Sequence, residues 1–261
     1  MAAVFRVIPD RVPQLETLGL PPILKDLALR PQGLLLVTGP TGHGKSTTQA
    51  AMVDLINTTR KAHIITVEDP IEFLHRNRLS VVEQREVGDD TQGFAQALRR
   101  VLRQAPDVIL IGEMRDLETM SAALTAAETG HLVISTLHTN DAVQSVDRIL
   151  DSFPAHQANQ VRSQLSLSLL AVFAQRLLPR ADGQGLTVAS ELLINNPASA
   201  HLIREGKTHH LYSVMETHGR EGMHTLDLSL KGLYLRGAIT KEEALRRMRN
   251  PDALTREIAG S

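Results

Sequence analysis

The sequence predicts an α/β fold with a mostly parallel central sheet and helices on both faces. Four apolar runs alternate along the chain with stretches of helical periodicity, and three of the runs end in glycine or an acidic residue. That alternation is typical of parallel strands joined by helical crossovers. The length of 261 residues suits one large domain, or one large domain with a small partner. Because ligands of parallel sheets bind beyond the carboxyl ends of the strands, the polar strand ends are the first place to look for function.

The four apolar runs are the predicted strands. They cover residues 34–39, 63–69, 107–113 and 131–137. Each run is continuous rather than alternating, which is the pattern of a strand buried on both faces. Residues 187–194 could add one more strand. The first 33 residues are rich in proline and are expected to be irregular, except that residues 3–9 (AVFRVIP) are typical of a short strand.

Helical periodicity fills the segments between the strands. Residues 45–60, 117–128 and 141–150 are predicted helices, and a helical period also connects Phe94 to Leu102. Residues 161–178 form a further, long helical pattern.

Two helix-start signals occur near the end of the chain. Asn196 before Pro197 is a cap followed by a first-turn proline, and Thr240 with Glu243 is a capping box. The last part of the chain is therefore predicted to be helical.

The composition excludes several functional classes. Cysteine is absent, which removes disulfides, cysteine zinc sites, iron–sulfur clusters and thiol nucleophiles. The 28 basic and 29 acidic residues nearly balance and aromatic residues make up 3%, so nucleic acid is not the expected partner. The longest apolar stretch, residues 165–173, is too short to span a bilayer. We therefore expect no direct membrane insertion.

The segment GPTGHGKS matches the phosphate-binding pattern GxxxxGK(S/T) in full. It follows a predicted buried strand and precedes a predicted helix, where backbone N–H groups and the helix N-terminus attract phosphate. Lys45 is then expected to reach the β- and γ-phosphates, and Ser46 to place a hydroxyl on Mg²⁺. The predicted nucleotide-binding residues are Gly39, Pro40, Thr41, Gly42, His43, Gly44, Lys45, Ser46 and Thr47.

A phosphate loop needs a carboxylate near the magnesium ion and a group that orients the attacking water. Glu113 ends an apolar strand, as the first of these should. An isolated carboxylate at a strand end is usually just a solvent-exposed charge. In a chain with a phosphate loop, a role near the magnesium ion is the favoured interpretation for Glu113. Glu68, Asp69 and Glu72 follow another strand, and their spacing does not choose among them.

Histidines and arginines supply further candidates. His131 and His138 flank one predicted strand, so at most one of them lies at its ligand end. His138 is a candidate sensor of the γ-phosphate, whereas the absence of cysteine and of an HExxH motif disfavours zinc. Most of the arginines between residues 85 and 115 are expected to be helix-face charges. One or two of them could act on a neighbouring subunit's nucleotide.

Four ordered motifs resemble those of the secretion-type hexameric ATPases and, within them, the type IV pilus retraction ATPases. GPTGHGKSTT is similar to their Walker A motif, ITVEDPIEF to their Asp box, PDVILIGEMRD to their atypical Walker B motif and ETGHLVISTLHTNDA to their His box. The resemblance runs from about residue 3 to about residue 243. It implies a RecA-like P-loop NTPase core at residues 33–195, a C-terminal helical region at 196–261, and at 1–32 a linker with the remnant of an N-terminal domain.

The resemblance also implies residue roles. Glu72 would be the catalytic base and Glu113 the Walker B acid, while Lys45 and Ser46 would serve phosphate and Mg²⁺. His131 and His138 would form the His-box pair. Arg85 and Arg103 would be inter-subunit contacts.

At the level of the whole protein, the resemblance implies Mg²⁺-dependent hydrolysis of ATP by a homo-oligomer, a hexameric ring. The ring would power type IV pilus retraction and twitching motility. Its partner would be a pilus inner-membrane platform protein, and the chain would be cytoplasmic and peripheral to the inner membrane through partners.

The sequence departs from the family pattern at three points. His43 stands where the family usually has serine, which we expect to be tolerated because the loop acts through backbone N–H groups. His201 replaces an asparagine of a retraction motif. The family also has an N-terminal domain before the motor, and this chain is expected to begin inside it.

Three alternatives remain at this point. Assembly-type secretion ATPases often carry a four-cysteine zinc element, which is absent here. An accessory nucleotide-binding subunit would act only with a full-length partner. A DNA motor is disfavoured by the balanced charge and the scarce aromatic residues.

Overall fold

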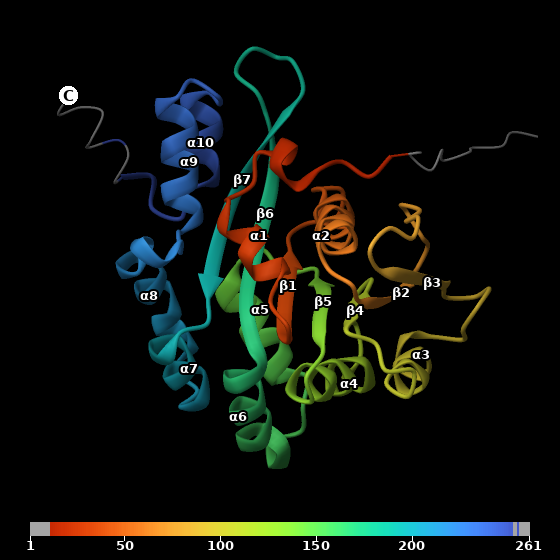
Figure 1. The fold of residues 1–261 in the computed structure, drawn as a ribbon. Helices are drawn as coiled ribbons and strands as arrows, with labels where there is room; N and C mark the ends of the chain where they lie inside the picture. The colour runs from red at the N-terminus through yellow and green to blue at the C-terminus, as the bar shows by residue number, and fades with distance from the viewer. Residues whose placement is uncertain (1–10, 253–254, 256–261) are drawn as a thin grey trace, which may run out of the picture.

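A seven-stranded sheet forms the centre of the molecule in the computed structural model, which describes residues 11–252 and 255 (Figure 1). Its strands are β1 (Gly33–Thr38), β2 (His63–Glu68), β3 (Val81–Glu86), β4 (Val108–Ile111), β5 (Leu132–Leu137), β6 (Leu169–Pro179) and β7 (Leu186–Ile194). Their order across the sheet is β3-β2-β4-β5-β1-β6-β7. All neighbouring pairs are parallel except β6 and β7, which are antiparallel. The predicted mostly parallel α/β fold is confirmed.

Strand β1 shows how the sheet separates two apolar layers. Leu34 and Leu36 point to one face and Leu35 and Val37 to the other, and all four are fully buried. The first face packs on α3 (Phe94–Val101), α4 (Leu117–Glu128), α5 (Ala142–Asp151) and α6 (Ala158–Ser168). The second face packs on α1 (Ile23–Ala28) and α2 (Lys45–Thr59). Full burial of each such leucine contributes about 1.5–3 kcal/mol, so the unbroken apolar runs are what place these strands at the centre.

Most predicted elements lie where the pattern placed them. Helices α2, α3, α4 and α5 and strands β1, β2, β4, β5 and β7 all fall within or close to the predicted ranges. Strand β4 is shorter than predicted, and Glu113 lies two residues beyond its end.

The helix predicted over residues 161–178 is wrong in its second half. Helix α6 ends at Ser168, and β6 begins at Leu169. Strand β6 lies between β1 and β7, so its residues 171–174 are buried on both faces. A strand of this kind carries no alternation, and a short apolar run without alternation fits a buried helix equally well.

Three further elements, in two regions of the chain, were not predicted. Strand β3 is an edge strand with little apolar character, and its Val81 is 53% exposed. The N-terminal segment is more ordered than its prolines suggest, with a 3₁₀ turn (Leu15–Leu18) and α1 packed against α2. The strand predicted at residues 3–9 lies outside the described residues.

After β7 the described chain is helical, with α7 (Pro197–Arg204), α8 (Leu211–Thr217), α9 (Leu226–Leu235) and α10 (Lys241–Arg247). Asn196 and Ser199 form the capping box of α7. Thr240 caps α10 by accepting from Glu243 N, as predicted, but the Glu243 carboxylate accepts from Arg247 Nε at 2.7 Å. Helices α9 and α10 lie beside the far end of the β6–β7 ribbon (Figure 1).

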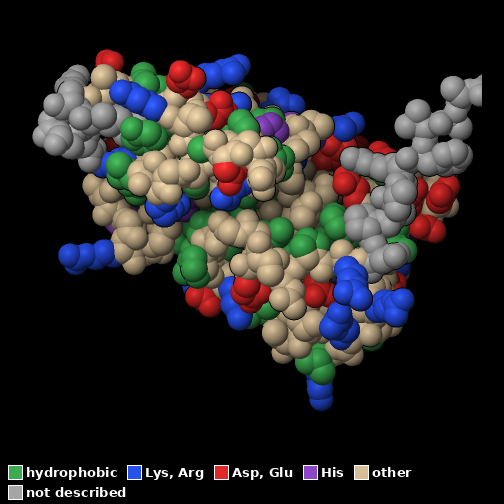
Figure 2. Space-filling model, turned by 90° about the horizontal axis from the view of Figure 1, so that it is seen from above, with side chains coloured by type: hydrophobic (Ala, Val, Ile, Leu, Met, Phe, Trp, Pro, Cys, Tyr) green, Lys and Arg blue, Asp and Glu red, His purple; other side chains and the backbone are tan. Residues whose placement is uncertain are grey.

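The surface carries both signs of charge. Lys or Arg and Asp or Glu side chains are spread over the face shown in Figure 2, in keeping with the balanced totals of 28 and 29. Within the described residues, no helix is long and apolar enough to cross a membrane.

Candidate active site

The phosphate loop connects the end of β1 to the start of α2. Gly44 is the N-cap of α2 with a φ of 81° and no side-chain cap, so no side chain of the loop competes for the first N–H groups of the helix. Gly39 has a φ of 138°, and a Cβ there would lie 2.3 Å from the carbonyl oxygen of Gln175 in β6. Only glycine fits at this close approach.

Lys45 is held at the mouth of the loop. Its side chain is buried, and Nζ donates to the carbonyl oxygens of Gly39 at 2.9 Å and Pro40 at 3.0 Å. Burial lowers the pKa of Lys45, while the charges of Glu113 and Glu72 act in the opposite direction. The lysine ammonium thus lies among backbone oxygens and near two carboxylates.

The three acids that the sequence left open occupy different environments. Ser46 Oγ donates to Glu72 Oε1 at 3.0 Å, which brings Glu72 to the loop. Glu68 accepts instead from Thr66 Oγ1 at 2.7 Å and Gln84 Nε2 at 3.2 Å, and burial raises the pKa of its carboxyl group. Asp69 is exposed.

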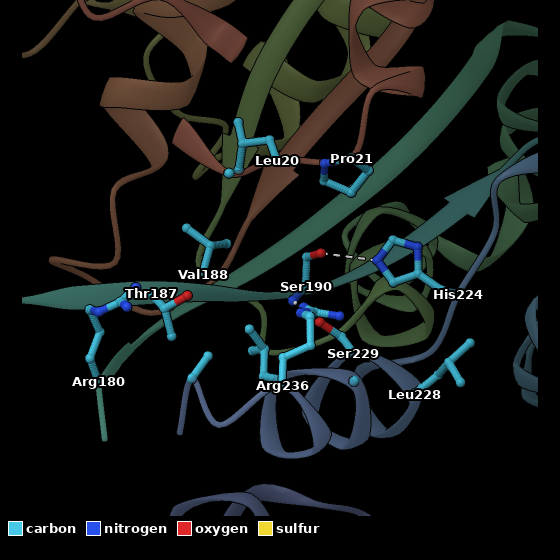
Figure 3. A pocket seen from close by; sticks show the side chains of 14 residues that line it. Leu20, Pro21, Arg180, Thr187, Val188, Ser190, His224, Leu228, Ser229 and Arg236 are labelled. Carbon is cyan, nitrogen blue, oxygen red and sulfur yellow. Dashed lines mark hydrogen bonds between the residues drawn. The ribbon is translucent and has the colours of Figure 1, made fainter. Parts of the chain in front are cut away.

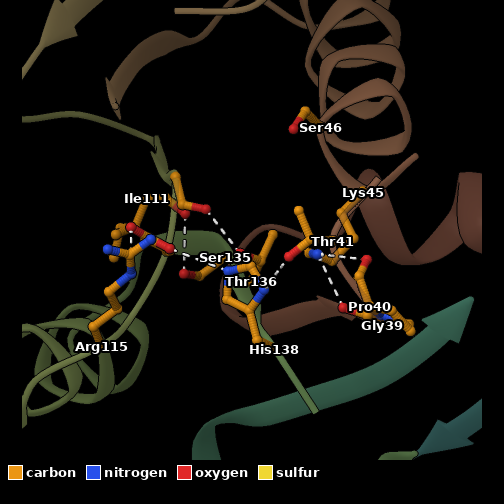
Figure 4. A network of polar contacts seen from close by, with 12 residues as sticks. Gly39, Pro40, Thr41, Lys45, Ser46, Ile111, Arg115, Ser135, Thr136 and His138 are labelled. Atoms are coloured by element: carbon orange, nitrogen blue, oxygen red, sulfur yellow. Dashed lines mark hydrogen bonds and ion pairs between the residues drawn. The ribbon is translucent and has the colours of Figure 1, made fainter. Parts of the chain in front are cut away.

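Figure 4 shows Thr41, Arg115 and His138 of a polar network that crosses the ends of two strands, and Glu113 belongs to the same network. Its carboxylate is paired with Arg115 Nε at 2.7 Å and with His138 Nε2 at 3.2 Å. The other ring nitrogen of His138, Nδ1, lies 3.3 Å from Thr41 Oγ1 of the phosphate loop. A neutral ring that donates from Nε2 and accepts the Thr41 hydroxyl at Nδ1 satisfies both contacts.

These groups line one cleft of about 510 Å³ beyond the carboxyl ends of the strands. Its walls include the loop, the first turns of α2, Glu72, Glu113 and His138. Ser46, Glu72 and Glu113 supply oxygen atoms only, and oxygen is the ligand that Mg²⁺ prefers. The donor set therefore fits a magnesium ion beside bound phosphate.

Three predicted site residues lie elsewhere. His131 precedes β5 at the end opposite His138, where its Nδ1 lies 3.0 Å from the carbonyl oxygen of Ala126. Arg85, on β3, donates to Gln104 at 2.7 Å and pairs with Glu83. Arg103 is exposed just after α3. The two histidines of the predicted pair are thus separated by the length of β5.

Gln175 is a site residue that the sequence did not reveal. Its amide Oε1 accepts from Thr48 Oγ1 at 2.8 Å, and its Nε2 donates to the carbonyl oxygen of His43 at 2.7 Å. It therefore bridges the phosphate loop and α2. The sequence pattern predicts helix for the segment around Gln175, so no sequence signal places it on a strand beside the loop.

A second cavity, of about 530 Å³, lies away from the loop between β7, α9 and the turn at residues 19–21 (Figure 3). His224 Nε2 lies 2.9 Å from Ser190 Oγ, and Ser190 N donates to Ser229 Oγ at 3.1 Å. Burial lowers the pKa of His224, which favours the neutral ring. The cluster fastens the segment before α9, and α9 itself, to β7.

Comparison with known proteins agrees with this geometry. Residues 3–249 match the family described as "Type II/IV secretion system protein". The chain is 53% identical to a twitching motility protein of Neisseria gonorrhoeae, over 97% of this chain and 68% of that protein. It is 52% identical to the type IV pilus retraction ATPase PilT of Pseudomonas aeruginosa, over 96% of this chain and 72% of that protein.

Solved structures show the same likeness. The pilus retraction motor PilT with bound ADP superposes with a TM-score of 0.90 at 51% identity, covering 96% of this chain and 71% of that one. The ATPase DotB of Legionella pneumophila gives a TM-score of 0.84 at 29% identity, covering 98% of this chain and 68% of that one. Because the match is close over nearly the whole chain and includes the complete phosphate loop, the chain belongs to the type II/IV secretion system protein family and is an ATPase of the PilT kind.

Proposed function

We propose that this chain hydrolyses ATP in a Mg²⁺-dependent reaction and forms part of a homo-oligomeric motor that powers type IV pilus retraction. The observation that carries the proposal is the contact of 3.0 Å between Ser46 Oγ and Glu72 Oε1. It supports the proposal because the carboxylate belongs to the segment after β2 and lies beside the loop that would hold the phosphates. Glu113 and Lys45 line the same cleft.

Each residue has a distinct part in the proposed reaction. The backbone N–H groups of the loop and Lys45 would hold the phosphates and stabilise the charge that develops on them. Ser46 and Glu113 would hold Mg²⁺, which would neutralise phosphate charge when bound. Glu72 would orient the attacking water and accept its proton. His138 would align Glu113 through its contact of 3.2 Å with that carboxylate.

The proposed motor extends beyond one chain. We propose a hexameric ring that is cytoplasmic and peripheral to the inner membrane through a platform protein of the pilus. The relatives, a twitching motility protein and a pilus retraction ATPase, support the role in the pilus, whereas the ring and the platform partner are what the family resemblance implies. Arg85 and Arg103 lie outside this chain's own cleft, so they are proposed as contacts to a neighbouring subunit.

Glu72→Gln tests the central assignment. Removing the base should lower ATP turnover by about 10²–10⁴-fold, whereas binding of a fluorescent ADP analogue should change by less than about threefold because the loop is intact. Glu68→Gln is the comparison variant, since Glu68 lines the same cleft but is bonded to Thr66 and Gln84 rather than to the loop. Wild-type turnover in Glu72→Gln would show that another group activates the water.

A further inference from the structure

Strand β6 continues beyond the end of its neighbour β1. The two strands pair from Leu34 with Leu169 to Thr38 with Ala174, but β6 runs on to Pro179. Past Ala174, the edge of β6 that faces β1 therefore has no strand beside it. Backbone groups on such an edge still require hydrogen-bond partners.

The phosphate loop supplies those partners through His43. Leu177 N donates to the ring atom Nδ1 of His43 at 2.9 Å. Two residues earlier, Gln175 Nε2 donates to the carbonyl oxygen of His43 at 2.7 Å. Both the side chain and the main chain of His43 are thus hydrogen-bonded to β6. The imidazole ring accepts a hydrogen bond on the edge of β6 that has no β1 residue beside it.

The contact requires a neutral ring. Nδ1 accepts a hydrogen bond only when it carries no proton, which leaves the proton on Nε2. Burial is the main cause that lowers the pKa of His43, and the positive charges of Arg247 on α10, Arg176 on β6 and Lys45 on α2 lower it further. The surroundings thus favour the form of His43 that the contact with Leu177 needs.

The same stretch of β6 supports the C-terminal helices. Leu178, the residue after Leu177, is fully buried in a cluster with Leu230 and Leu233 of α9 and Ala244 of α10. Arg247 lies at the end of α10. The loop therefore contacts β6 at Leu177, and the next residue of β6, Leu178, packs against α9 and α10.

We propose that His43 is a positioning residue that clamps the phosphate loop to β6 and thereby couples nucleotide binding to the C-terminal helices. The proposal rests on the nucleotide-binding function proposed above. With the clamp in place, the loop is already in its binding shape when nucleotide arrives. Without the clamp, only a fraction of the molecules has the loop in that shape, so the apparent affinity for nucleotide is lower.

His43→Leu and His43→Asn form a matched pair for the test. Asparagine has nearly the shape of leucine, but its Oδ1 occupies the position of the histidine Nδ1 and can accept from Leu177 N. Loss of the acceptor leaves a backbone N–H without its partner. We expect His43→Leu to raise the Kd for a fluorescent ADP analogue and the KM for ATP about tenfold, with kcat within about threefold. His43→Asn should restore both to within about twofold of wild type.

Hydrogen exchange measures the clamp directly. Without nucleotide, the Leu177 amide should exchange about tenfold faster in His43→Leu than in wild type or His43→Asn, because its hydrogen bond is lost. On adding ADP, α10 should become better protected in wild type and in His43→Asn but not in His43→Leu. His43→Ala, which adds no new contact, gives the same readouts if the leucine variant does not fold.

Two results would overturn the proposal. Wild-type Kd and wild-type Leu177 exchange in His43→Leu would show that no clamp exists. Loss of Leu177 protection with an unchanged response of α10 would show a clamp without coupling. If wild-type protein bound no nucleotide, the proposed function would fail, while the exchange of Leu177 without nucleotide would still decide whether the clamp exists.

Discussion

The ring of His138 connects three segments that are distant in the sequence. It follows β5, contacts Glu113 beyond β4 at 3.2 Å and lies 3.3 Å from Thr41 in the phosphate loop. Arg115 holds the other oxygen of Glu113 at 2.7 Å, from a largely exposed position. Of the two, His138 is the one that also reaches the loop, so it is the better placed to keep Glu113 aligned.

His138→Ala should lower kcat by about 10–100-fold and raise the Mg²⁺ concentration needed for half-maximal turnover, the usual effect of losing a group that orients a metal ligand. His131→Ala is the control, because His131 lies at the opposite end of β5 and should stay within about twofold of wild type. Turnover measured against Mg²⁺ concentration checks both. Equal losses in the two variants would mean that the effect does not pass through Glu113.

At the scale of elements, the sequence predicted the strands whose runs are apolar and the helices between them. It also predicted the complete phosphate loop and the strand-end acids. It did not predict β6, because a central strand buried on both faces has no alternation to distinguish it from a helix. It did not predict β3, because an edge strand needs few apolar residues.

The same limits apply to the candidate site. Residues that follow a strand, such as Glu113, could be placed at the correct edge of the sheet from sequence alone. Spacing alone did not choose among Glu68, Asp69 and Glu72, and the resemblance implied Glu72. The contact between Ser46 and Glu72 supports that proposal, and it could not be predicted because it depends on how the loop after β2 folds back. Gln175 remained hidden because its strand was not predicted.

Glu191 shows how one buried group connects three elements. From β7, its Oε1 accepts from the N–H of Ala142, the first residue of α5, at 2.8 Å. Its Oε2 accepts from the N–H of Leu226, the first residue of α9, at 3.3 Å. Desolvation raises the pKa of Glu191 above its ordinary value of 4.5. The carboxylate therefore helps to hold both helices on the sheet at the cost of burying its charge.

Glu191→Leu should lower the free energy of unfolding by about 1–3 kcal/mol, because both helix N–H groups lose their acceptor.

The raised pKa of Glu191 also predicts that stability depends on pH. The folded chain keeps the Glu191 proton to higher pH than the unfolded chain. The stabilisation of the folded state that comes from this pKa difference is complete below pH 4.5 and is lost as pH rises through the raised pKa. Urea unfolding between pH 4 and 7 should show that the free energy of unfolding of wild type, minus that of Glu191→Gln, falls as pH rises. A constant difference would contradict the assigned pKa shift.

At the scale of the whole molecule, the cleft is lined by residues of one chain, but two of the proposed functional residues are not among them. Arg85 and Arg103 lie on the β3 side of the sheet, which is an edge of the molecule. That edge is partly closed to further strands, because Val82 N donates to Asn77 Oδ1 and Glu86 N to Asp90 Oδ2. Side chains, rather than added strands, are thus the expected means of contact with a neighbouring subunit there.

If an arginine of one subunit completes the site of the next, ATP turnover per chain must depend on assembly. Turnover per chain should then climb steeply as protein concentration is raised, in step with oligomer formation measured by sedimentation. Arg103→Ala should lower turnover in the assembled state by up to about 10³-fold, the scale of an inter-subunit arginine, without weakening nucleotide binding. Turnover that is high and independent of concentration would show that each chain has a complete site. Turnover that stays near zero while nucleotide binds would instead assign hydrolysis to a complex with a further partner, because the loop and its carboxylates would then be present but insufficient.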